Sequence, residues 1–195
     1  HANYGQRTEN RELQSFHDLA DHYKVQEKLI IDMTHLNSIG GSCLTDENIA
    51  VPDANLENTQ IPISYVPFRN ANILSAAVSW AEVIKANSIY IGAVEEDSSG
   101  YPDCRKSFYD AFEKTISEGT RPETHIKIIT PIIELGKKDI VSKGIVLNAP
   151  LHLTWSCYKM EDTPCGKCDS CALREKGFQE AGVTDPLFVN PEQPV

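Results

Sequence analysis

Residues 70–94 read NANILSAAVSWAEVIKANSIYIGAV, a helical pattern that runs directly into a short apolar segment. Apolar side chains recur every three or four positions and share one helical face, namely Ile73, Leu74, Ala77, Val78, Ala81 and Ile84. This spacing predicts a helix over residues 70–85. The apolar segment 88–94 that follows is typical of a strand buried on both faces, as in a parallel sheet.

The same alternation extends on both sides of this stretch. Further helices are predicted over residues 8–24, 105–118, 137–143 and 171–182, and further strand segments over 1–4, 28–33, 63–67 and 126–130. Residues 37–62 are rich in Asn, Asp, Gly and Pro and predict a long loop. Strands separated by helices predict an α/β fold, a three-layer Rossmann-like arrangement whose parallel sheet is covered on both faces.

Four cysteines near the C-terminal end are spaced C-x7-C-x2-C-x2-C, at Cys157, Cys165, Cys168 and Cys171. Zinc bound by four thiolates takes a tetrahedral arrangement with sulfurs about 2.3 Å from the metal. Pro164 and Gly166 flank Cys165 and favour the tight turn that such a zinc knuckle needs. Four thiolates leave no open coordination position, so we expect a structural zinc site followed by a helix.

Other uses of these cysteines remain open at this point. An iron–sulfur cluster also takes four thiolates, and spacing alone does not separate it from zinc. Two disulfides suit a small secreted domain, whereas 195 residues can bury a core and we recognise no secretory signal. A redox pair would be a lone C-x2-C motif. Cys43 and Cys104 stand alone and are expected to pack as small hydrophobic side chains.

The composition is that of an ordinary globular protein, with 41% hydrophobic and 24% charged residues. No apolar run approaches the ~20 residues needed to span a bilayer. The formal net charge of −10 disfavours a surface that binds nucleic acid as a whole. We therefore expect a cytoplasmic protein with no membrane and no direct nucleic-acid partner. Its domains are predicted as an α/β domain over 1–150 and a zinc-binding element over 151–195.

Polar segments follow the predicted strands, at the sheet edge where ligands bind in parallel α/β folds. Residues 66–70, VPFRN, place the Arg69 guanidinium and the Asn70 carboxamide at a helix N-terminus, where backbone N–H groups lack helical partners. This combination could bind an anion or a carbonyl group. The alternative is that Asn70 only caps the helix and Arg69 is solvated.

Residues 95–105, EEDSSGYPDCR, join three acids, a glycine, a Tyr-Pro pair and an Asp and an Arg. Carboxylates accept hydrogen bonds from amino and guanidine-like N–H groups, and tyrosine offers a stacking face for a flat heterocycle. An acidic turn at Gly100 would explain Glu95 and Glu96 but not residues 101–105. Lys137 begins a predicted helix and is a candidate phosphate contact, although lysines there are often only exposed.

Four features of this chain are segments 4–7, 66–70 and 99–105 and the four cysteines. They occur in the same order in the 7-cyano-7-deazaguanine synthase family. The chain resembles this family over nearly all of its 195 residues. The resemblance implies the adenine-nucleotide α-hydrolase-like fold of the PP-loop ATP-pyrophosphatase superfamily. It also implies an ATP-dependent carbon–nitrogen ligase that converts 7-carboxy-7-deazaguanine and ammonia to the nitrile in queuosine biosynthesis, a pathway of tRNA modification. Zn²⁺ on the four cysteines, ATP with Mg²⁺ as substrate and a homodimer are implied as well.

The resemblance further implies roles for individual residues. Arg69 and Lys137 are the candidate catalytic residues, through contacts to phosphate or carboxylate groups. The side chains expected around the deazaguanine are Arg69, Asn70, Asp97, Tyr101, Asp103 and Arg105. Those expected at the nucleotide are Gln6, Arg7 and Lys137.

The chain departs from the superfamily in one respect. The phosphate loop, of the form Ser-Gly-Gly-x-Asp-Ser, is not found; the double glycine Gly40-Gly41 lacks the Asp and is not followed by a helical pattern. In this family the loop would lie about thirty residues before His1, judged from the length of a strand–helix–strand unit. We therefore expect these 195 residues alone to bind ATP poorly.

Two other functions remain possible on the sequence. One is a different PP-loop enzyme that modifies tRNA, for which a basic surface would be expected. The other is a zinc-knuckle binding module without catalysis, which predicts no affinity for nucleotides.

Overall fold

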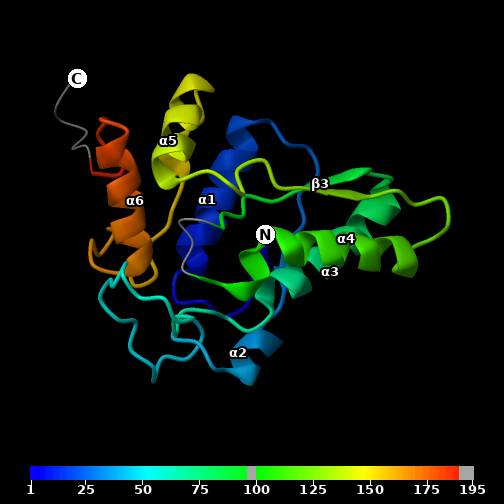
Figure 1. Cartoon of the computed structure of the whole chain (residues 1–195), viewed down its shortest axis with the longest axis horizontal. Helices are drawn as coiled ribbons and strands as arrows, with labels where there is room; N and C mark the ends of the chain where they lie inside the picture. Colours follow the sequence, from blue (N-terminus) through cyan, green and yellow to red (C-terminus); the bar gives the residue numbers. More distant parts are fainter. Residues whose placement is uncertain (96–99, 189–195) are drawn as a thin grey trace. The chain divides into compact units, whose positions relative to one another are not determined.

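The computed structural model describes residues 1–95 and 100–188 (Figure 1). The chain divides into two compact units. The first consists of His1–Asn58, Ile63–Val66 and Gly136–Val195, and the second of Thr59–Pro62 and Pro67–Leu135. The predicted boundary at residue 150 stays a prediction. Within the described residues, no helix combines the length and apolar character that crossing a bilayer requires.

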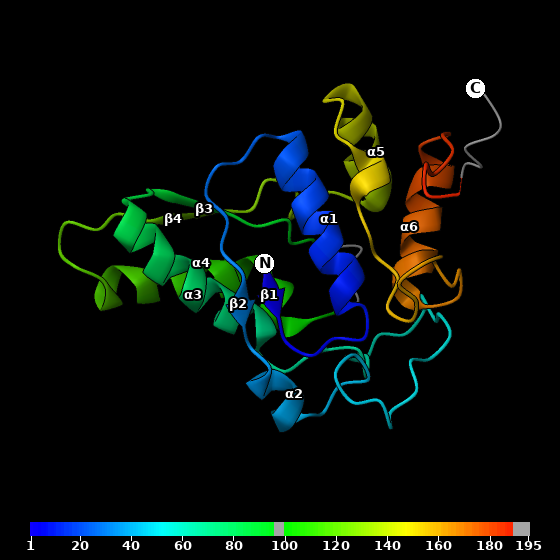
Figure 2. The same ribbon diagram turned by 180° about the vertical axis from the view of Figure 1, so that it is seen from behind.

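The first unit contains a parallel strand pair joined by a helix. Strand β1 (Ala2–Asn3) pairs in parallel with β2 (Ile31–Asp32), and α1 (Glu9–His22) forms the connection between them (Figure 2). Gly5 makes the turn after β1 with φ +75°, and a Cβ atom there would lie 2.8 Å from the Cβ atom of Asn37. Only glycine meets both the backbone and the steric requirement. The short helix α2 (His35–Ile39) follows β2.

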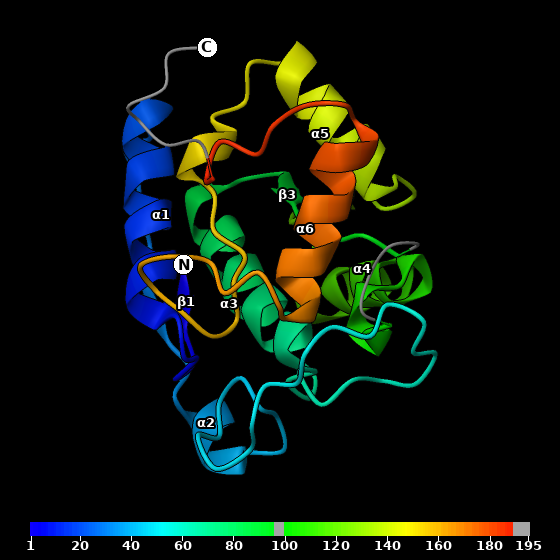
Figure 3. The ribbon, with the colours of Figure 1, turned by 90° about the vertical axis from the view of Figure 1, so that its left-hand side faces the viewer.

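The rest of the first unit is helical and ends in the cysteine-containing segment. Helices α5 (Lys137–Val146) and α6 (Asp169–Glu180) lie side by side (Figure 3), and the 3₁₀ turn η2 (Leu151–Leu153) lies between them in sequence. Gly177 permits their close packing, because a Cβ atom on it would lie 2.8 Å from the Cβ atom of Lys137.

The second unit contains the other parallel pair. Helix α3 (Arg69–Ile84) leads into β3 (Ser88–Tyr90), which pairs with β4 (Lys127–Ile129) in the register Ile89↔Ile128. The 3₁₀ turn η1 (Pro102–Cys104) and helix α4 (Lys106–Gly119) connect them. The core is built from apolar residues of α3, α4 and the strands, with Leu74, Ala81, Ala93, Tyr109, Ile116, Ile126 and Ile133 buried.

The structure confirms an α/β chain with parallel strands, and all five predicted helices form near the expected positions. The predicted strand at residues 63–67 is wrong, since these residues form a turn. Pro62 and Pro67 bound this segment and cannot donate backbone hydrogen bonds to a sheet. The other strands are shorter than predicted, because ladder hydrogen bonds extend only as far as the neighbouring strand.

Candidate functional site

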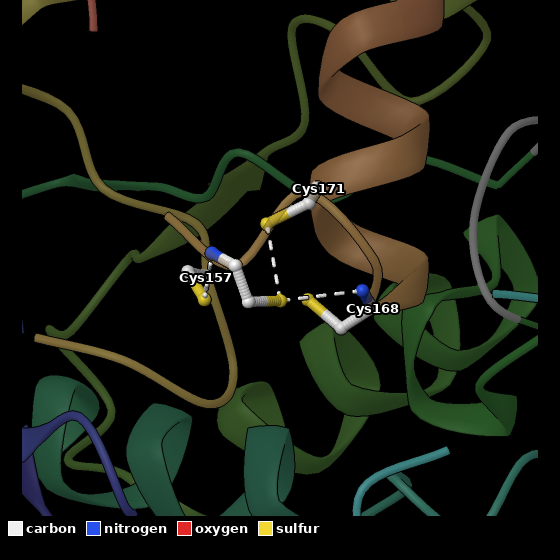
Figure 4. Close-up of side chains that lie close together, drawn as sticks. Cys157, Cys168 and Cys171 are labelled. Atoms are coloured by element: carbon white, nitrogen blue, oxygen red, sulfur yellow. Dashed lines mark hydrogen bonds between the residues drawn. The ribbon is translucent and has the colours of Figure 1, made fainter. Parts of the chain in front are cut away.

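The four predicted cysteine ligands converge in the first unit. The sulfur atoms of Cys157, Cys165, Cys168 and Cys171 all lie within 4.8 Å of one another. The sulfurs of Cys165 and Cys171 are 3.9 Å apart, close to the edge of about 3.8 Å expected for a zinc tetrathiolate. Figure 4 shows the cysteines at the start of α6 with their sulfurs directed toward one another. This geometry and donor set fit a structural metal ion.

Local structure explains how the chain brings the sulfurs together. Cys168 is the N-cap residue of α6 and Cys171 lies in its first turn, so the two side chains are one helical turn apart. Gly166 has φ +68° and reverses the chain between Cys165 and Cys168. Cys157 arrives from the segment after η2 and is almost completely buried, as are Cys168 and Cys171.

Backbone N–H groups surround the sulfurs. The Cys157 sulfur accepts three, at 3.3–3.4 Å, and the Cys165 sulfur accepts two, both at 3.4 Å. Their donors are Lys159, Met160, Cys165, Lys167 and Cys168. Hydrogen bonds of this kind stabilise a thiolate relative to a thiol and orient it toward a metal.

The thiols differ in acidity. A hydrogen bond from the Cys171 thiol and backbone N–H groups lower the pKa of Cys168 to about 5. The pKa of Cys171 is raised, first because its thiol donates to Cys168 and then because it is buried. Burial also raises the pKa of Cys165. A metal ion would displace the thiol protons that remain in this cluster.

In the second unit, two segments predicted to bind ligand meet directly. The backbone N–H of Asn70 donates to Asp103 Oδ2 at 2.9 Å, and the Asn70 carboxamide donates to the Asp103 carbonyl at 2.9 Å and to the Cys104 sulfur at 3.3 Å. Tyr109 donates from its hydroxyl to the same carbonyl at 3.0 Å. Asn70 therefore does not cap α3 itself; the carboxylate of Asp103 does. Burial, together with Cys104 and Asp103, raises the pKa of Tyr109.

The remaining predicted substrate residues of this unit flank that junction. Arg69 is the first residue of α3 and is half-buried, Tyr101 is buried, and Arg105 is the exposed N-cap residue of α4. Asp97 lies outside the described residues. Phe68, just before Arg69, has φ 56°, a left-handed conformation that costs a residue with a Cβ atom roughly 1–2 kcal/mol. Strain of this kind is concentrated at functional sites.

The predicted nucleotide residues belong to the first unit. Gln6 is buried, accepts a hydrogen bond from the Tyr4 N–H at 2.9 Å and donates to Glu12 at 3.1 Å. Arg7 donates from its guanidinium to three backbone carbonyls of residues 43–49. Lys137 begins α5 and is half-buried. Gly40 and Gly41 have φ values of 76° and 84° and, as predicted, lie in a loop that does not open a helix.

Comparison with known proteins identifies the family. A family model described as "Queuosine biosynthesis protein QueC" matches residues 1–182. The chain belongs to the QueC family. It is 60% identical over 187 residues to the 7-cyano-7-deazaguanine synthases of Chlorobaculum parvum and Chlorobium chlorochromatii, covering 96% of this chain and 82% of each relative. The synthase of Chlorobaculum tepidum is 59% identical over the same coverage. The resemblance predicted from the motifs is thereby confirmed.

Two features of this QueC-family chain were missed from the sequence. Tyr109 completes the Asn70–Asp103 junction, and the only sequence signal is an aromatic residue within the helical pattern 105–118. Arg174, which is half-buried, forms a bidentate ion pair with the buried Asp185, at 2.5 and 2.8 Å. Two charged residues eleven positions apart give no sign in the sequence that they will form an ion pair.

Proposed function

We propose that this chain catalyses the formation of 7-cyano-7-deazaguanine in queuosine biosynthesis. The observation that carries the proposal is about 60% identity to 7-cyano-7-deazaguanine synthases over 96% of the chain. The substrates would be 7-carboxy-7-deazaguanine, ammonia and ATP with Mg²⁺, which makes the enzyme an ATP-dependent carbon–nitrogen ligase. The Mg²⁺ would be held mainly by phosphate oxygens.

The chemistry requires two activations. A carboxylate is a poor electrophile because its leaving group would be oxide. Transfer of an adenylyl or phosphoryl group from ATP turns that oxygen into a good leaving group, and ammonia then forms the amide. A second activation of the amide oxygen, followed by elimination, gives the nitrile. The protein must therefore position the nucleotide and the acid together and stabilise negative charge as it develops.

These chemical requirements suggest a role for each candidate residue. Arg69 would contact the carboxylate or a phosphate from the strained start of α3, and Lys137 would contact phosphate from the start of α5. The deazaguanine would be held by Asn70, Asp97, Tyr101, Asp103 and Arg105. Gln6 and Arg7 would line the nucleotide site. The convergence of Arg69, Asn70 and Asp103 at one helix N-terminus supports the substrate part of this assignment.

The four cysteines would hold Zn²⁺. A closed set of four sulfurs supplies structural stability, joining the segment of Cys157 to the start of α6. We further propose that the parallel strand pairs are parts of a three-layer Rossmann-like fold, with the α/β domain over 1–150 and the zinc element over 151–195. The protein would act as a cytoplasmic homodimer without direct contact to nucleic acid.

The decisive experiment is to incubate the intact gene product with ATP, Mg²⁺, ammonium and 7-carboxy-7-deazaguanine. Mass spectrometry should detect the nitrile, and omission of ATP should abolish it. Arg69→Ala should lose most turnover, whereas Arg121→Ala, an exposed arginine in the same unit, should not. ATP binding without nitrile formation, accompanied by modification of added tRNA, would favour a different PP-loop enzyme. Absence of both ATP binding and turnover would favour a binding module.

A further inference from the structure

Residues 43–55 of the first unit form neither helix nor strand. Short turns within residues 42–49 and contacts with other segments order them. Arg7 holds the first half of this loop. Its Nε atom donates to the Cys43 carbonyl at 2.7 Å, and its Nη2 atom donates to the carbonyls of Asp46 and Ile49, both at 2.9 Å. The Arg7 backbone N–H donates to the Leu44 carbonyl at 3.1 Å. Three of the five guanidinium N–H groups of Arg7 therefore donate to backbone carbonyls of this loop.

The cysteine-containing segment holds the second half of the loop. The Ala54 N–H donates to the Lys167 carbonyl at 2.7 Å, and the Asn55 N–H donates to Asp169 Oδ1 at 3.0 Å. Lys167 and Asp169 are the two neighbours of Cys168 in the chain. Asp53 adds an exposed ion pair with Lys159 at 2.9 Å, two residues after Cys157.

Apolar packing reinforces this second attachment. Val51 packs against the buried cluster of Cys157, Cys168 and Cys171. Fixing each backbone residue of a loop costs conformational entropy. Contacts such as these add to the turns within residues 42–49 in offsetting that cost, so loss of either attachment should loosen its half of the loop.

We propose that Arg7 is a positioning residue which, together with the metal-binding cysteine cluster, holds residues 43–55 in one conformation. Segment 4–7 directly follows β1, at the edge of a parallel sheet where ligands bind. The metal site would therefore stabilise more than the C-terminal helix, because it orders a loop whose other end is fixed beside that edge. The importance of the loop for turnover rests on the proposed function, whereas the coupling of metal and loop does not.

Hydrogen exchange measured by mass spectrometry on the metal-loaded intact protein tests the coupling. Removing the metal with a chelator should make the amides of residues 51–55, the half of the loop attached to the cysteine segment, exchange about five- to tenfold faster, as expected for lost hydrogen bonds. Peptides of β3 and β4 should be unchanged. Faster exchange confined to residues 157–180, with 51–55 still protected, would overturn the role of the metal.

Matched variants keep the test valid if the metal-free protein unfolds. Asp169→Ala removes the acceptor of the Asn55 N–H, whereas Asp169→Asn keeps an oxygen there. We expect faster exchange at residues 53–55 in the first variant alone, with metal content unchanged in both. Equal protection in the two variants would overturn this attachment.

Arg7→Lys tests the other attachment, because lysine keeps the charge but cannot reach three carbonyls at once. Exchange at residues 43–49 should rise about five- to tenfold with metal retained, and Arg121→Lys should have no effect there. For the proposed reaction, Arg7→Lys should lower kcat more than it raises KM for the deazapurine acid. Unchanged exchange in Arg7→Lys would overturn the positioning role. If the hydrogen-exchange results are as expected but the protein forms no nitrile, only the proposed function is overturned.

Discussion

The carboxylate of Asp103 caps helix α3 by accepting the backbone N–H of Asn70 at 2.9 Å. Both residues are buried, and the Asn70 side chain returns a hydrogen bond to the Asp103 carbonyl. The two segments that the sequence marks as ligand-binding are therefore joined through a reciprocal pair. Asp103 has a structural role whether or not it also contacts the substrate.

Substitution of Asp103 separates these two roles. Asp103→Ala removes the cap and should lower the free energy of unfolding by about 1–2 kcal/mol, with loss of turnover. Asp103→Asn keeps an oxygen for the Asn70 N–H but removes the charge that would grip the deazaguanine N–H groups. It should therefore unfold nearly like the wild type in urea, yet lose at least about tenfold in turnover. If Asp103→Asn turned over like the wild type, capping of α3 would be the only role of Asp103.

The helices were predictable because their apolar spacing is a local property. The patterns at residues 70–85 and 105–118 gave α3 and α4 nearly to their ends. The pairing of Asn70 with Asp103 could not be predicted in the same way, since it depends on where two loops meet in space. The segment 63–67 was predicted as a strand, whereas the structure has a turn there, bounded by Pro62 and Pro67.

The cysteine site could be predicted in detail because three of its ligands lie within seven residues. The cysteine spacing could not predict that residues 51–55, more than a hundred positions away, contact this site. The contacts of Arg7 could not be predicted from the sequence either. Its position after β1 suggested a nucleotide contact, whereas its bonds to residues 43–49 follow from the course of a loop without periodicity.

Cys168→Ser should abolish metal binding. A serine hydroxyl is not deprotonated at neutral pH, so the site loses one of its four possible thiolate ligands. Metal content measured by mass spectrometry should fall from about one equivalent to near zero, while the helical signal of the second unit persists. Cys104→Ser, in the other unit, is the control and should retain the metal. An unchanged metal content in Cys168→Ser would refute the assignment, and iron with a visible absorbance band would indicate a cluster.

Tyr109 should make the second unit sensitive to alkali. Burial raises its pKa above the value of 10.0 that it has in the unfolded chain. The native state therefore keeps a proton that the unfolded state releases, so this stabilisation is complete below about pH 10 and is lost as the pH rises further.

Urea unfolding at about pH 8 and about pH 11 measures this effect. Tyr109→Phe should be less stable by about 1 kcal/mol at the lower pH, because the hydroxyl bond to Asp103 is missing. Its stability should then fall less steeply with pH than that of the wild type. Tyr23→Phe, at an exposed position, should follow the wild type. Equal pH dependence in Tyr109→Phe and the wild type would show that Tyr109 is not the responsible group.

Among the ion pairs of the described residues in the first unit, Arg174–Asp185 should be the most costly to break. The side chains are 12% and 6% exposed. Arg174 also donates to Thr154 at 2.8 Å and to the Leu151 carbonyl at 3.2 Å. Asp185→Asn leaves the guanidinium buried without its counter-charge and should lower the free energy of unfolding by about 3 kcal/mol.

A double-mutant cycle with Arg174→Met isolates the interaction. The double variant Arg174→Met/Asp185→Asn should be destabilised by clearly less than the sum of the single variants, because neither charge is then left unpaired. Lys127→Ala, which breaks an ion pair whose lysine is 71% exposed, should change stability by less than about 1 kcal/mol. Additive effects of the two substitutions would mean that the pair contributes no specific coupling, and that each residue acts through its separate contacts to Thr154, Leu151 and Leu187.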